Sequence, residues 1–225
     1  MNTHTPLQNW RQLPSIWDIA DEIAWLVDGL IPQGGFTILS ADSGTGKSWL
    51  AYAIAGAVSQ GIPLIGKKTT QRPVLYVDGE NPAAIVKRNL TDLAIPRTDQ
   101  LQVWGRWVRD DPPGTAEHLL VTNFASREQG LIIYDSLIEF HDGDEQDASS
   151  TRQFMKQFRV LTSLGATVLL LCHTGKSDKS RASAKNHFRV AHWEATVEGS
   201  SMKALSAVSR RWVSCSGVRA MKLLK

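Results

Sequence analysis

The sequence has few cysteines, little net charge and no long apolar run. Its two cysteines, Cys172 and Cys215, are too few for a disulfide framework, which excludes a small disulfide-stapled scaffold and favours a reducing compartment. No stretch holds the run of about 18 apolar residues that a membrane-spanning helix needs, and residues 1–11 contain no apolar signal segment. We therefore expect a cytoplasmic protein that has no membrane partner.

The net charge of +3 hides an asymmetry along the chain. Residues 171–225 contain 11 Lys and Arg against 3 Asp and Glu, a balance of +8, which leaves −5 for residues 1–170. Such a cluster of positive charge is typical of a surface that meets phosphates, although a solvated basic segment has the same composition. Nucleic acid is the partner that we favour.

Strands and helices are expected to alternate along the chain. Short β-rich runs predict strands at residues 36–41, 73–78, 101–104, 130–135 and 166–172. Helical patterns follow at residues 48–58, 82–93, 116–126 and 149–164. Several strand runs lack polar alternation, which is typical of strands that are buried on both faces. The pattern predicts an α/β fold with a mostly parallel central sheet and helices on both faces. Residues 10–32, rich in Trp, Ile and Leu, are predicted to pack on its core.

A glycine-bearing loop between the first strand and the first helix carries the strongest functional signal. It fits the phosphate-loop pattern in the form that allows alanine at the first position. Backbone N–H groups and the helix N-terminus would surround the β-phosphate of ATP, while Lys47 neutralises charge and Ser48 binds Mg²⁺. A chance glycine turn is the alternative, which the strand before and the helix after disfavour. The predicted nucleotide-binding residues are Ala41, Asp42, Ser43, Gly44, Thr45, Gly46, Lys47, Ser48 and the adjacent Trp49.

Two acidic residues at the ends of predicted strands are candidates for metal binding and hydrolysis. Asp135 follows four apolar residues and is predicted to hold Mg²⁺ together with Ser48; a turn or cap is its alternative role. Glu80 follows the strand that comes after the phosphate-loop helix, and we predict that it is the general base. Its alternative role is to cap the next helix, for which Asn81 is also a candidate N-cap residue, with Pro82 in the first turn.

Polar and basic residues follow the last predicted strand. His173 is either a structural residue or a sensor of the γ-phosphate at the carboxyl edge of the sheet. The loop at residues 175–189 contains five basic residues and a single acid. It either contacts a nucleic-acid backbone without reading its sequence or is simply a mobile loop. The nucleic-acid candidates are Lys176, Lys179, Arg181 and Lys185.

Taken in order, these segments resemble the RecA-like hexameric ATPases related to the plasmid replicative helicase RepA, a group often found in plasmids and phages. The resemblance rests on the phosphate loop and on the segments at residues 30–35, 74–80, 131–137, 142–149, 172–176 and 199–201. It divides the chain into three parts. Residues 1–25 are an N-terminal extension, residues 26–201 the RecA-like ATPase domain, and residues 202–225 a short basic segment that is either naturally short or truncated.

The resemblance also implies roles for single residues. Lys47 and Ser48 would bind ATP and Mg²⁺, and Asp135 would be the second acidic motif. Glu80 would be the catalytic glutamate and His173 the γ-phosphate sensor. Members of the family act as homo-oligomeric rings in which the neighbouring subunit contributes an arginine. The candidates for that arginine are Arg210, Arg211 and Arg219.

Three functions come into consideration. The first is a Mg²⁺-dependent ATPase stimulated by single-stranded DNA, a helicase or helicase-like replication protein of a mobile element, which Glu80 and the basic loop favour. The second is an ATP-dependent switch or scaffold with little turnover. The third, a small-molecule phosphotransferase, needs a lid and an acceptor pocket, and the sequence has no arginine-rich lid. We expect the first.

Overall fold

The computed structural model describes residues 9–13, 15–18, 22–41, 44–110, 112, 118–136, 148–173 and 189–192. Two short 3₁₀ helices lie near the N-terminus, η1 (Trp10–Gln12) and η2 (Ile16–Asp18). The strands are β1 (Trp25–Val27), β2 (Ile31–Pro32), β3 (Phe36–Ala41), β4 (Val74–Asp78), β5 (Leu101–Gly105), β6 (Leu131–Asp135), β7 (Thr167–His173) and β8 (Arg189–His192). The α-helices are α1 (Lys47–Gln60), α2 (Ala83–Asp92), α3 (Leu119–Arg127) and α4 (Ala148–Ser163).

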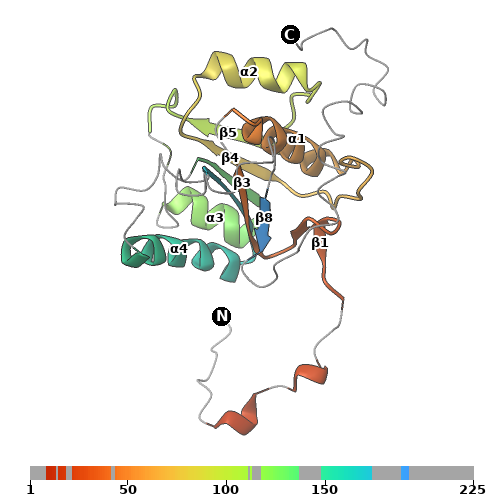
Figure 1. Ribbon diagram of the computed structural model, residues 1–225, viewed down its shortest axis with the longest axis vertical. Coiled ribbons are helices and arrows are strands. Elements are labelled where there is room, and N and C mark those ends of the chain that lie inside the picture. Colours follow the sequence, from red (N-terminus) through yellow and green to blue (C-terminus); the bar gives the residue numbers. More distant parts are fainter. Residues whose placement is uncertain are drawn as a thin grey trace, which may run out of the picture.

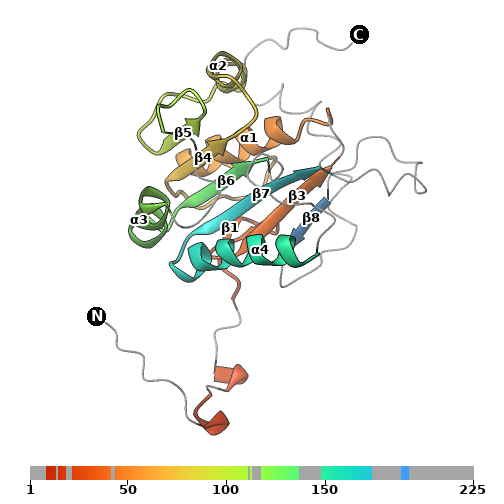
Figure 2. The ribbon, with the colours of Figure 1, turned by 90° about the vertical axis from the view of Figure 1, so that its left-hand side faces the viewer.

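Strands β3 to β8 form one six-stranded sheet in the order β5-β4-β6-β7-β3-β8 (Figure 2). Strands β1 and β2 form a separate antiparallel pair. The first five strands run parallel, whereas β8 pairs antiparallel with β3. The five parallel strands therefore end at one edge of the sheet, where the following loops bring polar side chains together. The α/β fold with a mostly parallel central sheet, predicted from the sequence, is confirmed.

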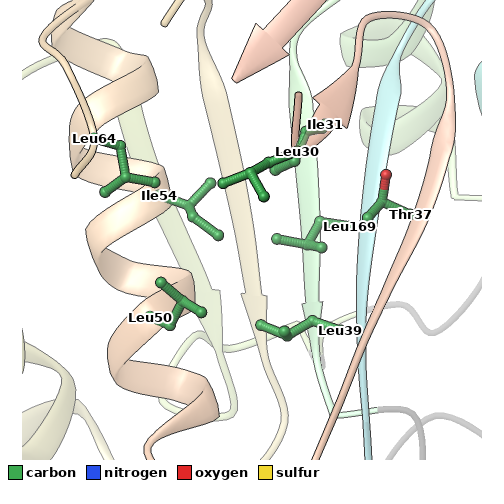
Figure 3. A pocket seen from close by; sticks show the side chains of 8 residues that line it. All are labelled: Leu30, Ile31, Thr37, Leu39, Leu50, Ile54, Leu64 and Leu169. Atoms are coloured by element: carbon green, nitrogen blue, oxygen red, sulfur yellow. The ribbon is translucent and has the colours of Figure 1, made fainter. Parts of the chain in front are cut away.

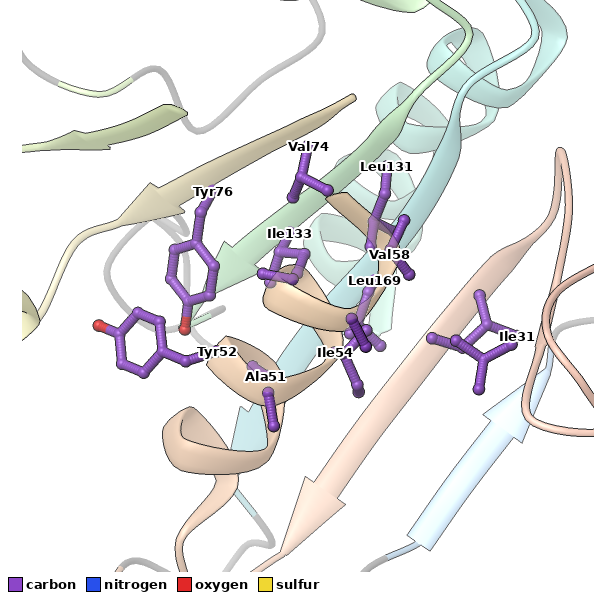
Figure 4. Packing of buried hydrophobic residues seen from close by; sticks show 14 of the residues in the cluster. Ile31, Ala51, Tyr52, Ile54, Val58, Val74, Tyr76, Leu131, Ile133 and Leu169 are labelled. Carbon is purple, nitrogen blue, oxygen red and sulfur yellow. The ribbon is translucent and has the colours of Figure 1, made fainter. Parts of the chain in front are cut away.

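Helices cover both faces of the sheet (Figure 1). Helix α1 packs on β3, β4, β5 and β6 with α2 beside it, whereas α4 packs on β3 and β7 with α3 beside it. Successive strand residues alternate between two cores, so that Tyr76 and Ile133 face α1 (Figure 4) while Val77 and Tyr134 belong to the other core. Among the described residues, no helix is both long and apolar enough to cross a bilayer.

An apolar pocket lies between α1, the β1–β2 pair and the neighbouring strands β3 and β7 (Figure 3). Its walls are hydrocarbon apart from the Thr37 hydroxyl, and no charged side chain lines it. It therefore offers no group that could bind phosphate or a metal, and it is a packing feature of the fold. The lining residues are Leu30, Ile31, Thr37, Leu39, Leu50, Ile54, Leu64 and Leu169.

Two predictions made from the sequence are wrong at element boundaries. Residues 10–32 do not pack on the core as a unit, because Trp10 and Trp17 are 71% and 89% exposed, whereas Leu26 and Ile31 are buried. The 3₁₀ turns of this segment bury none of their residues, so among its described residues burial begins at β1. The helix predicted from residue 116 begins at Leu119, because the ring of His118 caps it by accepting the Leu120 N–H at 3.2 Å.

We expect Ile133→Ala to lower the free energy of unfolding by about 2–5 kcal/mol, because it opens a cavity in a core that cannot fully collapse. Ile133 is 0% exposed in the centre of β6. The control is Val160→Ala on α4, where the side chain is 49% exposed and the expected change is within about 0.5 kcal/mol. Urea denaturation measures both variants, and equal effects would contradict the assigned core.

Candidate active site

The described part of the loop between β3 and α1, residues 44–46, has the backbone that a phosphate loop requires. Gly44 and Gly46 have φ values of 75° and 92°, in the left-handed region that favours glycine. A Cβ built on either residue would meet nothing within 4 Å, so the space beside the loop backbone is open. Gly46 is also the N-cap of α1 and has no side chain to satisfy the first helix amides. Those amides and the positive end of the helix fit an anion such as a phosphate.

Lys47 is held inside this loop. Its side chain is only 6% exposed, and its ammonium Nζ donates a hydrogen bond to the Ala41 carbonyl oxygen at 2.8 Å. Ala41 is the last residue of β3 and Lys47 the first of α1, so the bond joins the two ends of the loop. A buried ammonium gains from a negative partner, which the phosphates of a nucleotide would supply.

Ser48 and Asp135 meet at the end of β6. The Asp135 carboxylate is 1% exposed and accepts hydrogen bonds from the hydroxyls of Ser48 and Tyr76, the latter at 2.6 Å. Burial raises the pKa of Asp135 to about 6, the hydrogen bonds oppose this, and the charges of Asp78 and Glu80 add to it. A carboxylate beside a serine hydroxyl is a pair of hard oxygen donors, which suits Mg²⁺. The residues present therefore fit the metal that the sequence predicts.

Asp78 organises the loop that carries Glu80. Its carboxylate is fully buried and accepts the backbone N–H groups of Glu80 at 3.0 Å and Asn81 at 2.8 Å. Tyr52 of α1 donates its hydroxyl to the second carboxylate oxygen at 2.5 Å. The Asn81 side chain also donates to Asp78, at 3.3 Å, instead of capping α2, whose N-cap is Pro82. The predicted N-cap role of Asn81 is therefore wrong, because a buried carboxylate recruits its amide.

Glu80 lies at the same sheet edge as Asp135. Its carboxylate oxygen Oε1 accepts a hydrogen bond from the hydroxyl of Ser136, the residue after Asp135. The backbone is tied as well, because the Gly79 N–H donates to the Asp135 carbonyl oxygen at 2.8 Å. The β4–β6 register places Asp78 directly opposite Asp135. The Glu80 carboxylate, which could hold a water, thus lies beside Ser48 and Asp135, the candidate metal ligands.

The other predicted residues are placed only in part. The backbone of His173 pairs with Ala41 in the β3–β7 register, which brings the end of β7 to the start of the phosphate loop. Trp49 is 43% exposed on α1, directly after Ser48. Asp42 and Ser43 of the loop, the candidate nucleic-acid residues Lys176, Lys179, Arg181 and Lys185, and the candidate ring arginines Arg210, Arg211 and Arg219 lie outside the described residues.

Two buried tyrosines complete the site, and the sequence analysis missed them. The rings of Tyr52 and Tyr76 stack with their centroids 4.6 Å apart and their planes 16° apart, between α1 and β4 (Figure 4). Burial raises the pKa of both hydroxyls well above its usual value, so both remain protonated donors. Spacing was the available signal, because Tyr52 follows Ser48 by one helical turn and Tyr76 precedes Asp78 by one strand period.

We expect Gly46→Ala to abolish nucleotide binding, because a side chain at a φ of 92° strains the loop by about 1–2 kcal/mol and alters its anion-binding amides. The matched control is Gly66→Ala, which has a φ of 77° and equally open space but lies just beyond the opposite end of α1. Both variants should lose similar stability in thermal melts. Only Gly46→Ala should fail to bind a fluorescent ATP analogue, and retained binding would contradict the loop as the site.

A protein-family comparison agrees with this geometry. Residues 15–179 match the family described as AAA domain. No curated protein sequence matches the chain. A similar solved structure is the KaiC-like protein from the hyperthermophilic archaeon Pyrococcus horikoshii OT3, with 15% sequence identity and a TM-score of 0.47 over 77% of this chain and 86% of that chain. The family match covers well over half of the 225 residues, including the phosphate loop, Glu80 and Asp135. The chain therefore belongs to the AAA domain family of P-loop ATPases.

Proposed function

We propose that this protein is a Mg²⁺-dependent ATP hydrolase. The observation that carries the proposal is the hydrogen bond between the Ser48 hydroxyl and the Asp135 carboxylate. The next residue, Ser136, donates its hydroxyl to the Glu80 carboxylate. Together these contacts bring a metal-type donor pair, a phosphate loop and a carboxylate to one edge of the sheet. Phosphoryl transfer needs these three parts together.

Each residue has a defined part in the proposed reaction. The amides after Gly44 and at the start of α1 bind the phosphates of ATP, and Lys47 offsets their charge. Ser48 and Asp135 would hold Mg²⁺, and the chemistry that it supplies when bound is neutralisation of charge on the phosphate oxygens. Glu80 orients a water for in-line attack on the γ-phosphorus and accepts its proton as the bond to ADP breaks.

The biological role that we propose is that of a DNA-stimulated helicase-like replication protein of a mobile element, working as a ring. The support is the resemblance to RepA-related ATPases and the basic residues Lys176, Lys179, Arg181 and Lys185, which follow β7. Because β7 ends beside the phosphate loop, the chain enters this basic segment next to the candidate nucleotide site. His173, at the end of β7, would sense the γ-phosphate, and one of Arg210, Arg211 and Arg219 would reach the neighbouring subunit's site.

An ATP-dependent switch with little turnover is the second candidate function. The observation in its favour is the hydrogen bond from Ser136 to Oε1 of Glu80, which engages one of the two carboxylate oxygens that could accept a proton from water. In such a protein, ATP binding rather than hydrolysis sets the output.

Steady-state ATP hydrolysis with and without single-stranded DNA tests the proposal. We expect DNA to raise the rate, Lys47→Ala to abolish nucleotide binding, and Glu80→Gln to lower the rate by about 10²–10⁴-fold with binding retained. The matched control is Glu128→Gln at the exposed end of α3, which should leave the rate unchanged. Binding of ATP without turnover in either condition would refute the hydrolase and favour the switch.

A double variant tests the nucleic-acid part separately. Changing Lys176 and Lys179 to Ala should reduce the stimulation by DNA and make it less sensitive to salt, because fewer phosphates are neutralised. The basal rate should stay the same. Unaltered stimulation would contradict the assignment of these lysines to DNA.

A further inference from the structure

Asp78 has the sequence position of a catalytic or metal-binding acid, since it ends a buried strand beside Glu80 and opposite Asp135. Its hydrogen bonds assign it another task. One carboxylate oxygen accepts the backbone N–H groups of Glu80 and Asn81, and the other accepts the Tyr52 hydroxyl. The Asn81 side-chain amide lies 3.3 Å from both oxygens. Binding a metal would require Asp78 to give up donors that are themselves buried or partly buried.

We propose that Tyr52 and Asp78 form a positioning pair that fixes the loop of Glu80 relative to the phosphate-loop helix, with Tyr52 as a positioning residue for hydrolysis. The inference rests on the proposed function and deepens it. Through this pair, the Glu80 carboxylate, which would hold the attacking water, keeps a fixed position relative to helix α1, which would bind the phosphates.

The placement of Tyr52 on α1 is the first argument. Tyr52 follows Ser48 by four residues, so the two hydroxyls lie on one face of the helix, one turn apart. Ser48 reaches Asp135 at the end of β6, and Tyr52 reaches Asp78 at the end of β4. A displacement of α1 on phosphate binding would therefore act on both strand ends at once.

The rigidity of the link is the second argument. Tyr52 and Tyr76 are 0% exposed, and their stacked rings leave little rotational freedom. The Asp78 carboxylate is fully buried too, so water cannot replace the Tyr52 hydroxyl without a local rearrangement. Its two bonds to successive N–H groups define the turn from which the Glu80 side chain emerges.

Tyr76 provides a matched comparison, because it belongs to the same stacked pair but donates to Asp135 rather than Asp78. Tyr76→Phe removes the donor to the candidate metal ligand and the hydrogen bond that Tyr76 shares with Tyr52, but it leaves the Tyr52–Asp78 bond in place. Tyr52→Phe removes the donor to the loop anchor. Both substitutions keep the ring and its stacking. The two variants should therefore have similar effects on packing, but Tyr76→Phe should alter metal binding and Tyr52→Phe the position of the Glu80 loop.

The experiment compares these variants in the full chain by two measurements. Tyr52→Phe should lower kcat roughly ten- to hundredfold, the size expected for a displacement of about 1 Å, with the KM for ATP and the Mg²⁺ requirement unchanged. Tyr76→Phe should instead raise the Mg²⁺ concentration needed for half-maximal rate. Without nucleotide or metal, hydrogen exchange of the Glu80 and Asn81 amides should be faster in Tyr52→Phe and unchanged in Tyr76→Phe.

A double-variant cycle ties the effect to Glu80. If Tyr52 acts through Glu80, Tyr52→Phe should have no further effect on the residual rate of Glu80→Gln. Full activity of Tyr52→Phe with unchanged amide exchange, while Glu80→Gln is inactive, would overturn this inference alone. Full activity of Glu80→Gln would overturn the proposed function and the inference with it. Additive losses in the double variant would show that Tyr52 acts by general stability, which also overturns it.

Discussion

Two buried carboxylates at the ends of neighbouring parallel strands set the constraint on which the site depends. The register of β4 and β6 places Asp78 opposite Asp135 and buries both. Buried carboxylates need hydrogen-bond donors or a cation, because their desolvation is costly. One turn of α1 supplies a hydroxyl to each, Tyr52 to Asp78 and Ser48 to Asp135. The phosphate-loop helix is thereby fixed to the sheet at two points, one at the proposed metal pair Ser48–Asp135 and one at the positioning pair Tyr52–Asp78.

The two carboxylates play different parts because their surroundings differ. Asp78 is saturated by protein donors, which makes it an anchor for the turn at Glu80. Asp135 accepts two hydroxyls, and burial still raises its pKa to about 6, so that a bound cation would stabilise its ionised form. In the proposed mechanism, similar residues on equivalent strand ends would thus serve positioning in one case and metal binding in the other. Both residues are aspartates, so it is the number of protein hydrogen-bond donors around each carboxylate that distinguishes the two proposed roles.

Much of this could be predicted from the sequence, because strong local patterns determine it. The apolar run before Asp135 predicts a doubly covered strand, and the glycines at 44 and 46 predict a phosphate loop. The covered strand is found, and both glycines have the left-handed backbone that such a loop requires. The sequence could not reveal the exposure of Trp10 and Trp17, since apolar composition does not say what a segment packs against. Nor could it reveal the Tyr52–Asp78 bond, which depends on the register between α1 and β4 rather than on any local motif.

The most direct test of the central claim is the binding of Mn²⁺, as a spectroscopic substitute for Mg²⁺, in the presence of a non-hydrolysable ATP analogue. Electron paramagnetic resonance would compare the native chain with Asp135→Asn and with Asp92→Asn, a change at an exposed acid on α2. The account predicts one tightly bound Mn²⁺ per nucleotide in the native chain and in Asp92→Asn. It predicts an affinity lower by about tenfold or more in Asp135→Asn. Equal Mn²⁺ affinity in all three proteins would contradict the assignment of Asp135 to the metal.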